Sequence, residues 1–111
     1  MIAVIFEVVP SASGRGRYLE LAGDLADTLA GMEGFISVER FESLASPGKL
    51  LSLSFWRDEA AVAGWRRLEA HRAAQAEGRA GVFRDYRLRV AAVLRDYGLD
   101  ARDGAPPDAP R

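Results

Sequence analysis

The spacing of hydrophobic and polar residues changes several times along the chain, and each change predicts a different element. Residues 1–9 are almost continuously apolar and rich in β-branched side chains, with Glu7 as the interruption. This pattern is typical of a strand covered on both faces. Residues 15–30 repeat apolar side chains at helical spacing, and Gly31 follows the last of them. A glycine at that point predicts the end of a helix.

Two further extended segments follow, separated by turn residues. Residues 34–42 alternate in character and predict a strand that can extend to Ala45. Ser46, Pro47 and Gly48 are typical of a turn, and residues 49–56 form the next apolar run. Two extended runs joined by a short Pro-Gly loop favour a β-hairpin.

The second half of the chain predicts one more helix and one more strand. Asp58 is placed to cap a helix that begins at Glu59 and continues to about Glu77, with Val62 and Trp65 three residues apart on one face. Gly78 and Gly81 interrupt the pattern. Residues 86–94 then alternate apolar side chains with arginines, which predicts a final strand with one apolar face.

The resulting order, β-α-β-β-α-β, is that of the ferredoxin-like α+β fold. It predicts a four-stranded antiparallel sheet with both helices on one face. Residues 1–9 and 50–55 are too apolar for the other face to meet water alone. A second copy that covers it would close the two sheets into a dimeric α+β barrel, and we therefore predict a homodimer through the sheet face. A larger partner, or a monomer with a poorly covered sheet, would also fit the pattern.

Composition limits where and with what the protein works. Residues 1–98 form one predicted domain, and residues 99–111 are a Pro- and Asp-rich segment expected to be a flexible tail. The formal net charge is -1, which predicts neither nucleic-acid nor lipid binding. There is no cysteine and no apolar run of the roughly 20 residues that a membrane helix needs. These features favour a cytoplasmic protein.

Two titratable residues are candidates for acid–base chemistry. His71, the single histidine, has a side chain that titrates near neutral pH, although a surface or hydrogen-bonded helix position would explain it equally. Glu7 lies in an apolar strand, where desolvation would raise its pKa and make it a base. Alternatively, Glu7 pairs with Arg87 or Arg89 at a dimer interface, or reaches solvent.

Aromatic and basic residues are the candidates for ligand binding. Trp65 can line an apolar cavity or pack a helix on the sheet, and most of the other aromatic residues should belong to the core. The arginines of the second half can hold a phosphate, carboxylate or phenolate, or they can form a solvated helix face. The chain has no Gly-rich phosphate loop, no nucleophile elbow and no set of metal ligands at usable spacing.

The stretch from Ser54 to Trp65, in which an aromatic pair ends a strand and a Trp follows on the next helix, resembles the antibiotic biosynthesis monooxygenase family. Residues 69–75, Gly78-Arg79, residues 83–86 and the turn at 31–35 extend the similarity to roughly residues 1–97. The resemblance implies a dimeric α+β barrel with a pocket between sheet and helices. It also implies oxidation of small aromatic phenols, anthrones or quinols by O₂ without metal, haem or flavin.

The resemblance also suggests roles for individual residues. His71 or Glu7 would take a proton from the substrate. Trp65, Phe83 and Tyr86 would stack on its rings, Arg79 would hold an oxyanion, and Gln75 would line the site. No cofactor and no metal is expected, and the partners are a second copy and a small aromatic ligand.

Two alternatives remain open. Haem-degrading relatives combine an Asn on the first strand, a Trp on the second helical region and a His further along it. Here Trp65 keeps the Trp, Glu7 stands near the Asn position and Gln75 near the His position, so His71 would have to bind iron from about 5.4 Å earlier along the helix. The other alternative is a non-catalytic dimeric domain that binds a small molecule.

Overall fold

The computed structural model describes the backbone of residues 1–75 and 83–110 and the side chains of residues 1–68 and 83–110. Its elements are β1 (Ile2–Pro10), α1 (Arg15–Ala30), β2 (Phe35–Glu42), β3 (Leu50–Trp56), α2 (Glu59–Gln75) and β4 (Phe83–Ala92). The predicted β-α-β-β-α-β order is confirmed. Among the described residues, no helix is long and apolar enough to cross a membrane.

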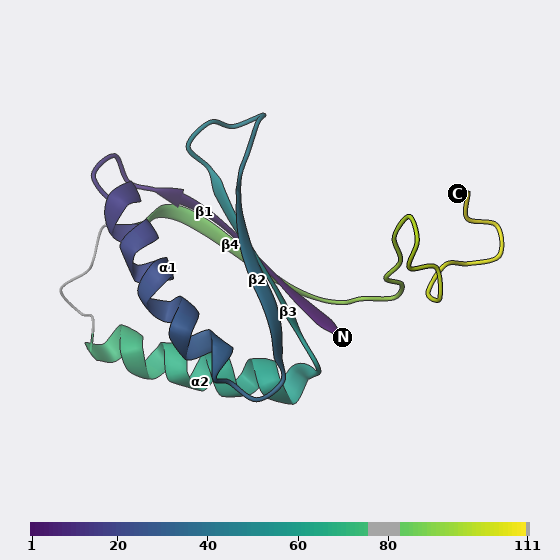
Figure 1. The fold of residues 1–111 in the computed structure, drawn as a ribbon. Coiled ribbons are helices and arrows are strands. Elements are labelled where there is room, and N and C mark those ends of the chain that lie inside the picture. The colour runs from purple at the N-terminus through teal and green to yellow at the C-terminus, as the bar shows by residue number, and fades with distance from the viewer. Residues whose placement is uncertain (76–82, 111) are drawn as a thin grey trace.

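The four strands form one antiparallel sheet in the order β2-β3-β1-β4. β1 lies between β3 and β4, so Val4 is paired with Ser54 on one side and with Val90 on the other. Both helices lie on the same side of the sheet (Figure 1). The architecture is therefore the ferredoxin-like α+β fold that the sequence predicts.

Three predicted strand boundaries differ from the structure by two residues or more. β2 ends at Glu42 and not near Ala45, because the amide of Ser43 already donates to the carbonyl of Lys49 and closes the hairpin. β4 begins at Phe83 and not at Tyr86, because its pairing with β1 shifts register and continues to Pro10. The same strand ends at Ala92 and not at Leu94, and the amide of Val93, just beyond it, donates to the carbonyl of Met1, which precedes β1.

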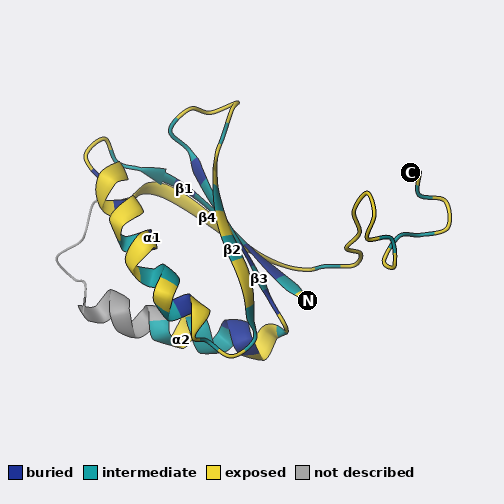
Figure 2. Cartoon of the chain, viewed as in Figure 1, coloured by how far each residue is buried: buried dark blue, intermediate teal, exposed yellow. Residues whose placement is uncertain are grey.

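Alternate residues of β1 form the core together with residues of the helices and β3. Figure 2 shows the buried positions in the strands and near the start of α2. Val4 packs with Leu29 of α1, Trp56 of β3, and Ala61 and Val62 of α2. Val8 packs with Tyr18 of α1 and Leu50 of β3. Since side chains alternate along a strand, Ile2, Val4, Phe6 and Val8 share this helix-covered face.

The opposite face of the sheet, which we call the open sheet face, has no helix over it. Its central side chains are apolar and only partly buried by their neighbours: Ile5, Leu51, Leu53, Phe55 and Phe41. Phe41 retains 42% of its surface exposed. The predicted apolar open face is thus present, and its pairing with a second copy stays a prediction.

Residues 93–110 leave the sheet beyond β4 and extend away from the helices and strands (Figure 1). We call this segment the C-terminal arm. It gives the molecule a radius of gyration of 16.1 Å, against about 13 Å for a compact chain of this length. The arm contains several turns. The flexibility expected for residues 99–111 stays a prediction.

Candidate functional site

Four aromatic side chains meet at one end of the helix-covered face. Phe6 of β1 lies 6.0 Å from Phe83 and 5.7 Å from Tyr86, measured between ring centroids. Phe83 is also 5.7 Å from Tyr18 of α1 and 6.3 Å from Tyr86. Most of these pairs are edge-to-face, the arrangement that aromatic quadrupoles favour. We call these four residues the aromatic cluster.

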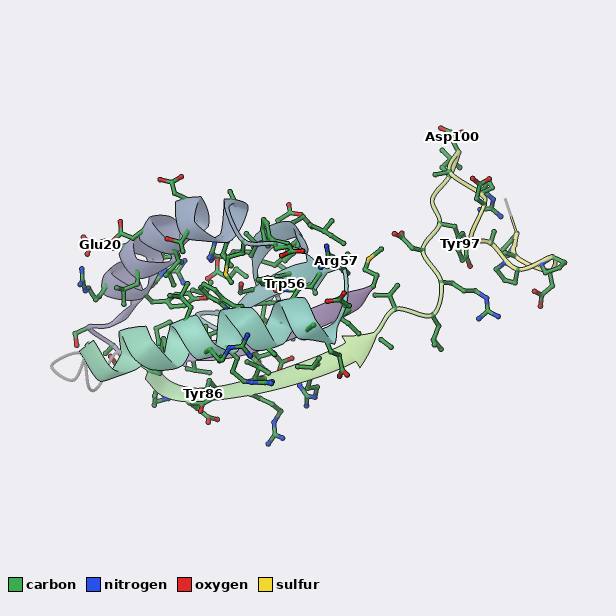
Figure 3. All side chains as sticks on the ribbon, turned by 90° about the horizontal axis from the view of Figure 1, so that it is seen from below. Glu20, Trp56, Arg57, Tyr86, Tyr97 and Asp100 are labelled. Atoms are coloured by element: carbon green, nitrogen blue, oxygen red, sulfur yellow. The ribbon has the colours of Figure 1, made fainter. Side chains whose placement is uncertain are left out.

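The aromatic cluster is buried on its α1 side and open on its β4 side. Tyr18 is 6% exposed, whereas Tyr86 is 61% exposed (Figure 3 labels Tyr86 on the outer strand). Leu88 and Val90, which share the helix-covered face with Tyr86, are exposed as well. Within the described part of the chain, this end of the sheet therefore presents an apolar aromatic surface that a planar ligand can contact.

The structure brings the predicted ligand residues Phe83 and Tyr86 together but places Trp65 in a different group. The ring of Trp65 stacks on Trp56, 6.3 Å between centroids, and Phe35 contacts Trp56 from another side. Trp56 is fully buried, and its Nε1–H donates to Ser54 Oγ at 2.9 Å. Trp65 is half-buried: part of its ring packs against the core, and the rest is accessible to solvent.

Arg40 of β2 adds a positive charge to the helix-covered face. Its Nη2 donates to the carbonyl of Ala22 in α1 at 3.3 Å, while its Nε–H is buried and has no hydrogen-bond partner among the residues that the structure describes. None of the ion pairs among the described residues includes Arg40. A partly buried cation without an acidic partner is costly, and its free donors favour the binding of an anionic group.

Arg40 and the aromatic cluster lie in the same cross-strand row. Arg40 is paired with Ser52 of β3, Ser52 with Phe6 of β1, and Phe6 with Leu88 of β4. Neighbouring strands are about 4.8 Å apart, so the backbones of Arg40 and Phe6 are separated by roughly 10 Å. A small ligand whose ring lies on Phe6 can therefore direct an anionic group toward Arg40 and the hydroxyl of Ser52.

Glu7 lies apart from these residues, and the expectation of a raised pKa is wrong. It is next to Phe6 in β1 and therefore faces the open sheet face. There its carboxylate accepts a hydrogen bond from Arg89 at 3.2 Å and pairs with Lys49 at 3.6 Å. These two cations, Arg89 first, hold the pKa of Glu7 below its ordinary value of 4.5. The alternative reading, a Glu paired with Arg89, is the one that the structure supports.

The remaining predicted site residues cannot be placed at the level of side chains. His71 and Gln75 lie in α2, but their side chains are outside the described residues, and Arg79 lies outside them altogether. The described residues contain no group of three or more His, Cys, Asp or Glu side chains that could hold a metal ion. The roles assigned to His71, Gln75 and Arg79 stay predictions.

Three residues of this site were missed from the sequence. Phe6 and Tyr18 belong to apolar patterns that a core explains completely, so nothing singled them out. Arg40 carried a usable signal: it follows Val38 by two residues and so shares its face, and a cation on the core face of a strand needs a partner.

Comparison with known proteins identifies the family of this chain. The sequence profile described as antibiotic biosynthesis monooxygenase matches residues 1–77. The chain is 50% identical over 93 residues to "Jasmonate monooxygenase ABM" of the fungus Pyricularia oryzae. That alignment covers 84% of this chain and 43% of the fungal protein, so the chain spans less than half the length of that relative.

Solved structures share the fold at low sequence identity. A putative antibiotic biosynthesis monooxygenase from Deinococcus radiodurans superposes with a TM-score of 0.74 and 16% identity, covering 89% of this chain and 98% of that one. A mutant of MhuD with two manganese protoporphyrin IX molecules bound per active site superposes with a TM-score of 0.70 and 19% identity, covering 88% and 99%. With its strand order, its two helices on one face and the profile match over most of its length, this chain belongs to the antibiotic biosynthesis monooxygenase family.

Proposed function

We propose that this protein is a cofactor-independent monooxygenase that oxidises a small aromatic or quinol-type substrate with O₂. The observation that carries the proposal is the open aromatic cluster on the helix-covered face, with Arg40, which has no ion-pair partner among the described residues, in the same cross-strand row. The family membership and the name of the fungal relative support monooxygenase chemistry.

The aromatic cluster binds the ring of the substrate. Phe6 and Phe83 provide the inner surface, and the exposed ring of Tyr86 can close on the ligand from the β4 side. When the ligand covers the cluster, the apolar and aromatic surroundings exclude water from the reacting carbon, which protects reactive intermediates. Trp65, Gln75 and Arg79 are proposed to line the same ligand from α2 and the segment that follows it.

Arg40 holds the oxygen that carries the negative charge. A guanidinium beside a phenol or enol stabilises the ionised form, so the substrate becomes an electron-rich anion near neutral pH. Such an anion can pass an electron to O₂ itself. For an anthrone, the CH₂ group becomes C=O; one oxygen atom enters the product, and the other leaves as water with the two hydrogens, so no external reductant is needed.

His71 is the proposed base that removes the substrate proton. Glu7, the other predicted base, lies on the opposite face of the sheet and is held ionised by Arg89 and Lys49. A carboxylate with a lowered pKa is a weak base, so the proposal assigns the proton transfer to His71 and a structural role to Glu7.

The test is O₂ consumption by the purified protein in the presence of a chelator, with an anthrone and a hydroquinone as substrates without added reductant, and with jasmonate in the presence of a two-electron reductant. Jasmonate is included because the fungal relative is named for it and because its carboxylate could occupy the position beside Arg40. We expect turnover of at least one of the three. Tyr86→Ala and Arg40→Gln should raise KM, and His71→Ala should lower kcat.

Leu19→Ala provides the matched control. Leu19, like Tyr86, is an exposed large side chain, but it lies on α1 and outside both core groups. It should leave the kinetics unchanged. Full turnover by His71→Ala would contradict the base assignment, and unchanged KM values for Arg40→Gln and Tyr86→Ala would contradict the ligand site. Ligand binding without O₂ consumption would instead favour the non-catalytic binding domain.

Haem binding is the second candidate, favoured by the likeness to the porphyrin-bound MhuD structure. The described residues supply no histidine or cysteine ligand for iron, so His71 would have to be the axial ligand. A hemin titration tests this: a saturating Soret shift at one haem per chain, lost in His71→Ala, would support haem chemistry over the cofactor-free reaction. No shift would exclude it.

We further propose that the protein is a homodimer paired through the open sheet face. Ile5, Leu51, Leu53 and Phe55 form an apolar surface that one copy leaves without a cover. Glu7 pairs with both Lys49 and Arg89 beside it, so the three groups carry one net positive charge and oppose burial less than three separate ions would. Leu53→Asp should therefore shift the protein to monomers in sedimentation velocity, and an unchanged dimer would contradict this interface.

A further inference from the structure

The C-terminal arm leaves the domain at the end of the sheet where β1 begins. The hydrogen bond from the amide of Val93 to the carbonyl of Met1 is the last backbone pair with the sheet. Beyond it the chain runs outward from the sheet (Figure 1), and Tyr97 and Asp100 lie far from Trp56 and the helices (Figure 3).

The outer part of the arm is held in one shape by Arg102. Its guanidinium donates to the carbonyl oxygens of Gly98, Ala109 and Pro110 at 3.2, 3.3 and 2.9 Å. It also lies over the ring of Tyr97, 5.2 Å from the centroid. The amide of Gly98 donates to the carbonyl of Ala101. The arm is therefore pre-organised by its own contacts, which lowers the entropy lost when such a segment binds a partner.

The arm presents apolar side chains that its own domain does not cover. Leu94 is 86% exposed and Leu99 is 79% exposed, with Tyr97 between them. Two almost fully exposed leucines on a segment with an ordered internal structure indicate a contact surface, because their burial against a partner gains free energy.

We infer that the arm of one copy binds across a second copy of this chain, where Leu94, Tyr97 and Leu99 extend the interface over the open sheet face. This inference rests on the proposed pairing of two sheets. Packed sheets are about 10 Å apart, whereas residues 93–99 can span roughly 20 Å when extended, so the arm can reach the partner. In a dimer with a two-fold axis, the two sheet faces would cover each other, and each arm would bind the opposite copy at the same time.

Charge supports a second copy as the occupant. Asp96 and Asp100 of the arm take part in no ion pair among the described residues, and the same is true of Arg84 and Arg87 of β4. The acidic arm thus fits the basic strand of a neighbouring copy, a complementarity that favours this pairing and its orientation.

The experiment is sedimentation velocity of the full chain over a concentration series. Leu94→Ser/Leu99→Ser should weaken the dimer at least about tenfold, because two buried leucines are lost from each arm. Leu19→Ser, a leucine exposed on α1, is the matched control and should leave the dimer unchanged. Arg87→Glu should weaken the dimer, and Arg87→Glu combined with Asp96→Arg/Asp100→Arg should restore part of it.

Unaltered thermal unfolding of the dilute variants would show that the domain itself is intact. If Leu53→Asp produces monomers while the arm variants still dimerise like the wild type, the sheet pairing stands and the arm inference fails. If none of the variants changes the dimer, both fail. Because the chain has no cysteine, Leu99→Cys gives a single labelling site. Energy transfer between separately labelled copies should appear on mixing, and its absence would overturn the inference. None of these measurements depends on turnover.

Discussion

Gly34 and Ala61 approach each other so closely that a Cβ added to Gly34 would lie 2.5 Å from the Cβ of Ala61. Gly34 also has a φ of +82°, and its carbonyl accepts a hydrogen bond from the amide of Arg57 at 2.7 Å. The turn before β2 is thereby fixed against the first turns of α2, next to the core formed by Trp56 and Val62.

Gly34→Ala should destabilise the protein by at least about 2 kcal/mol. The strain of alanine in the left-handed backbone conformation and the steric overlap with Ala61 both contribute to this loss. Urea unfolding measures the change. Gly48→Ala separates the two causes, since Gly48 has a φ of +91° but open space around its Cβ position. Equal losses for the two variants would mean that the contact with Ala61 contributes nothing.

Gly23→Ala should have the opposite effect and stabilise the protein. Gly23 lies inside α1, and a Cβ built on it meets no atom within 4 Å. Alanine restricts the unfolded chain and favours the helix, so we expect a stabilisation of about 0.5–1 kcal/mol in the same urea experiment. A loss of stability would contradict the open position of Gly23 on the helix surface.

Ser54→Ala should cost about 1–3 kcal/mol, because the buried Nε1–H of Trp56 would lose its acceptor. The thermal unfolding temperature measures this effect. Ser54→Thr keeps the hydroxyl and serves as the control, and it should recover most of the loss. If Ser54→Ala unfolds like the wild type, the hydrogen bond makes no net contribution to stability.

Asp58 caps α2, since its Oδ1 accepts a hydrogen bond from the amide of Ala61 at 2.9 Å. That bond, followed by the one from Arg57, lowers the pKa of Asp58 below 3.8. A lowered folded-state pKa means that the stabilisation is present above pH 3.8 and disappears as the pH falls below it. Asp58→Ala should therefore be less stable than the wild type at pH 7, and the two should converge in acid. Parallel pH profiles would contradict the cap.

Glu7 should contribute to acid sensitivity in the same direction. Arg89 and Lys49 lower its pKa below 4.5, so its contribution is complete above that pH and is lost as the pH falls through the folded-state pKa. Glu7→Gln should consequently flatten the decline of stability below pH 4.5, and high salt should shrink the difference because the pair is partly exposed. Lys49→Gln should have a smaller effect than Arg89→Gln.

The order of elements and most of their bounds were predicted from local patterns. The apolar run of residues 1–9, the helical spacing of residues 15–30 and the cap at Asp58 depend on neighbours in the sequence, and all three are confirmed. The site was predicted less completely. Phe83 and Tyr86 do meet, but Phe6 and Tyr18, which complete the cluster, come from elements more than 60 residues away.

The sequence by itself determined the fold class, because the period of its apolar residues sets helix or strand and their order limits the topology. Only the tertiary structure decided which strand side chains lie on the helix-covered face and which lie on the open sheet face. Phe35 and Phe41 have the same parity in an alternating strand, yet a register shift between Phe35 and Ser37 sends Phe35 to the core and leaves Phe41 on the open sheet face. Likewise Lys49, which directly precedes β3, and Arg89 of β4 pair with Glu7 and lower its pKa, whereas its place in an apolar strand had predicted a raised pKa. Register and long-range charge pairing depend on strands that are distant in the chain, so no local pattern records them.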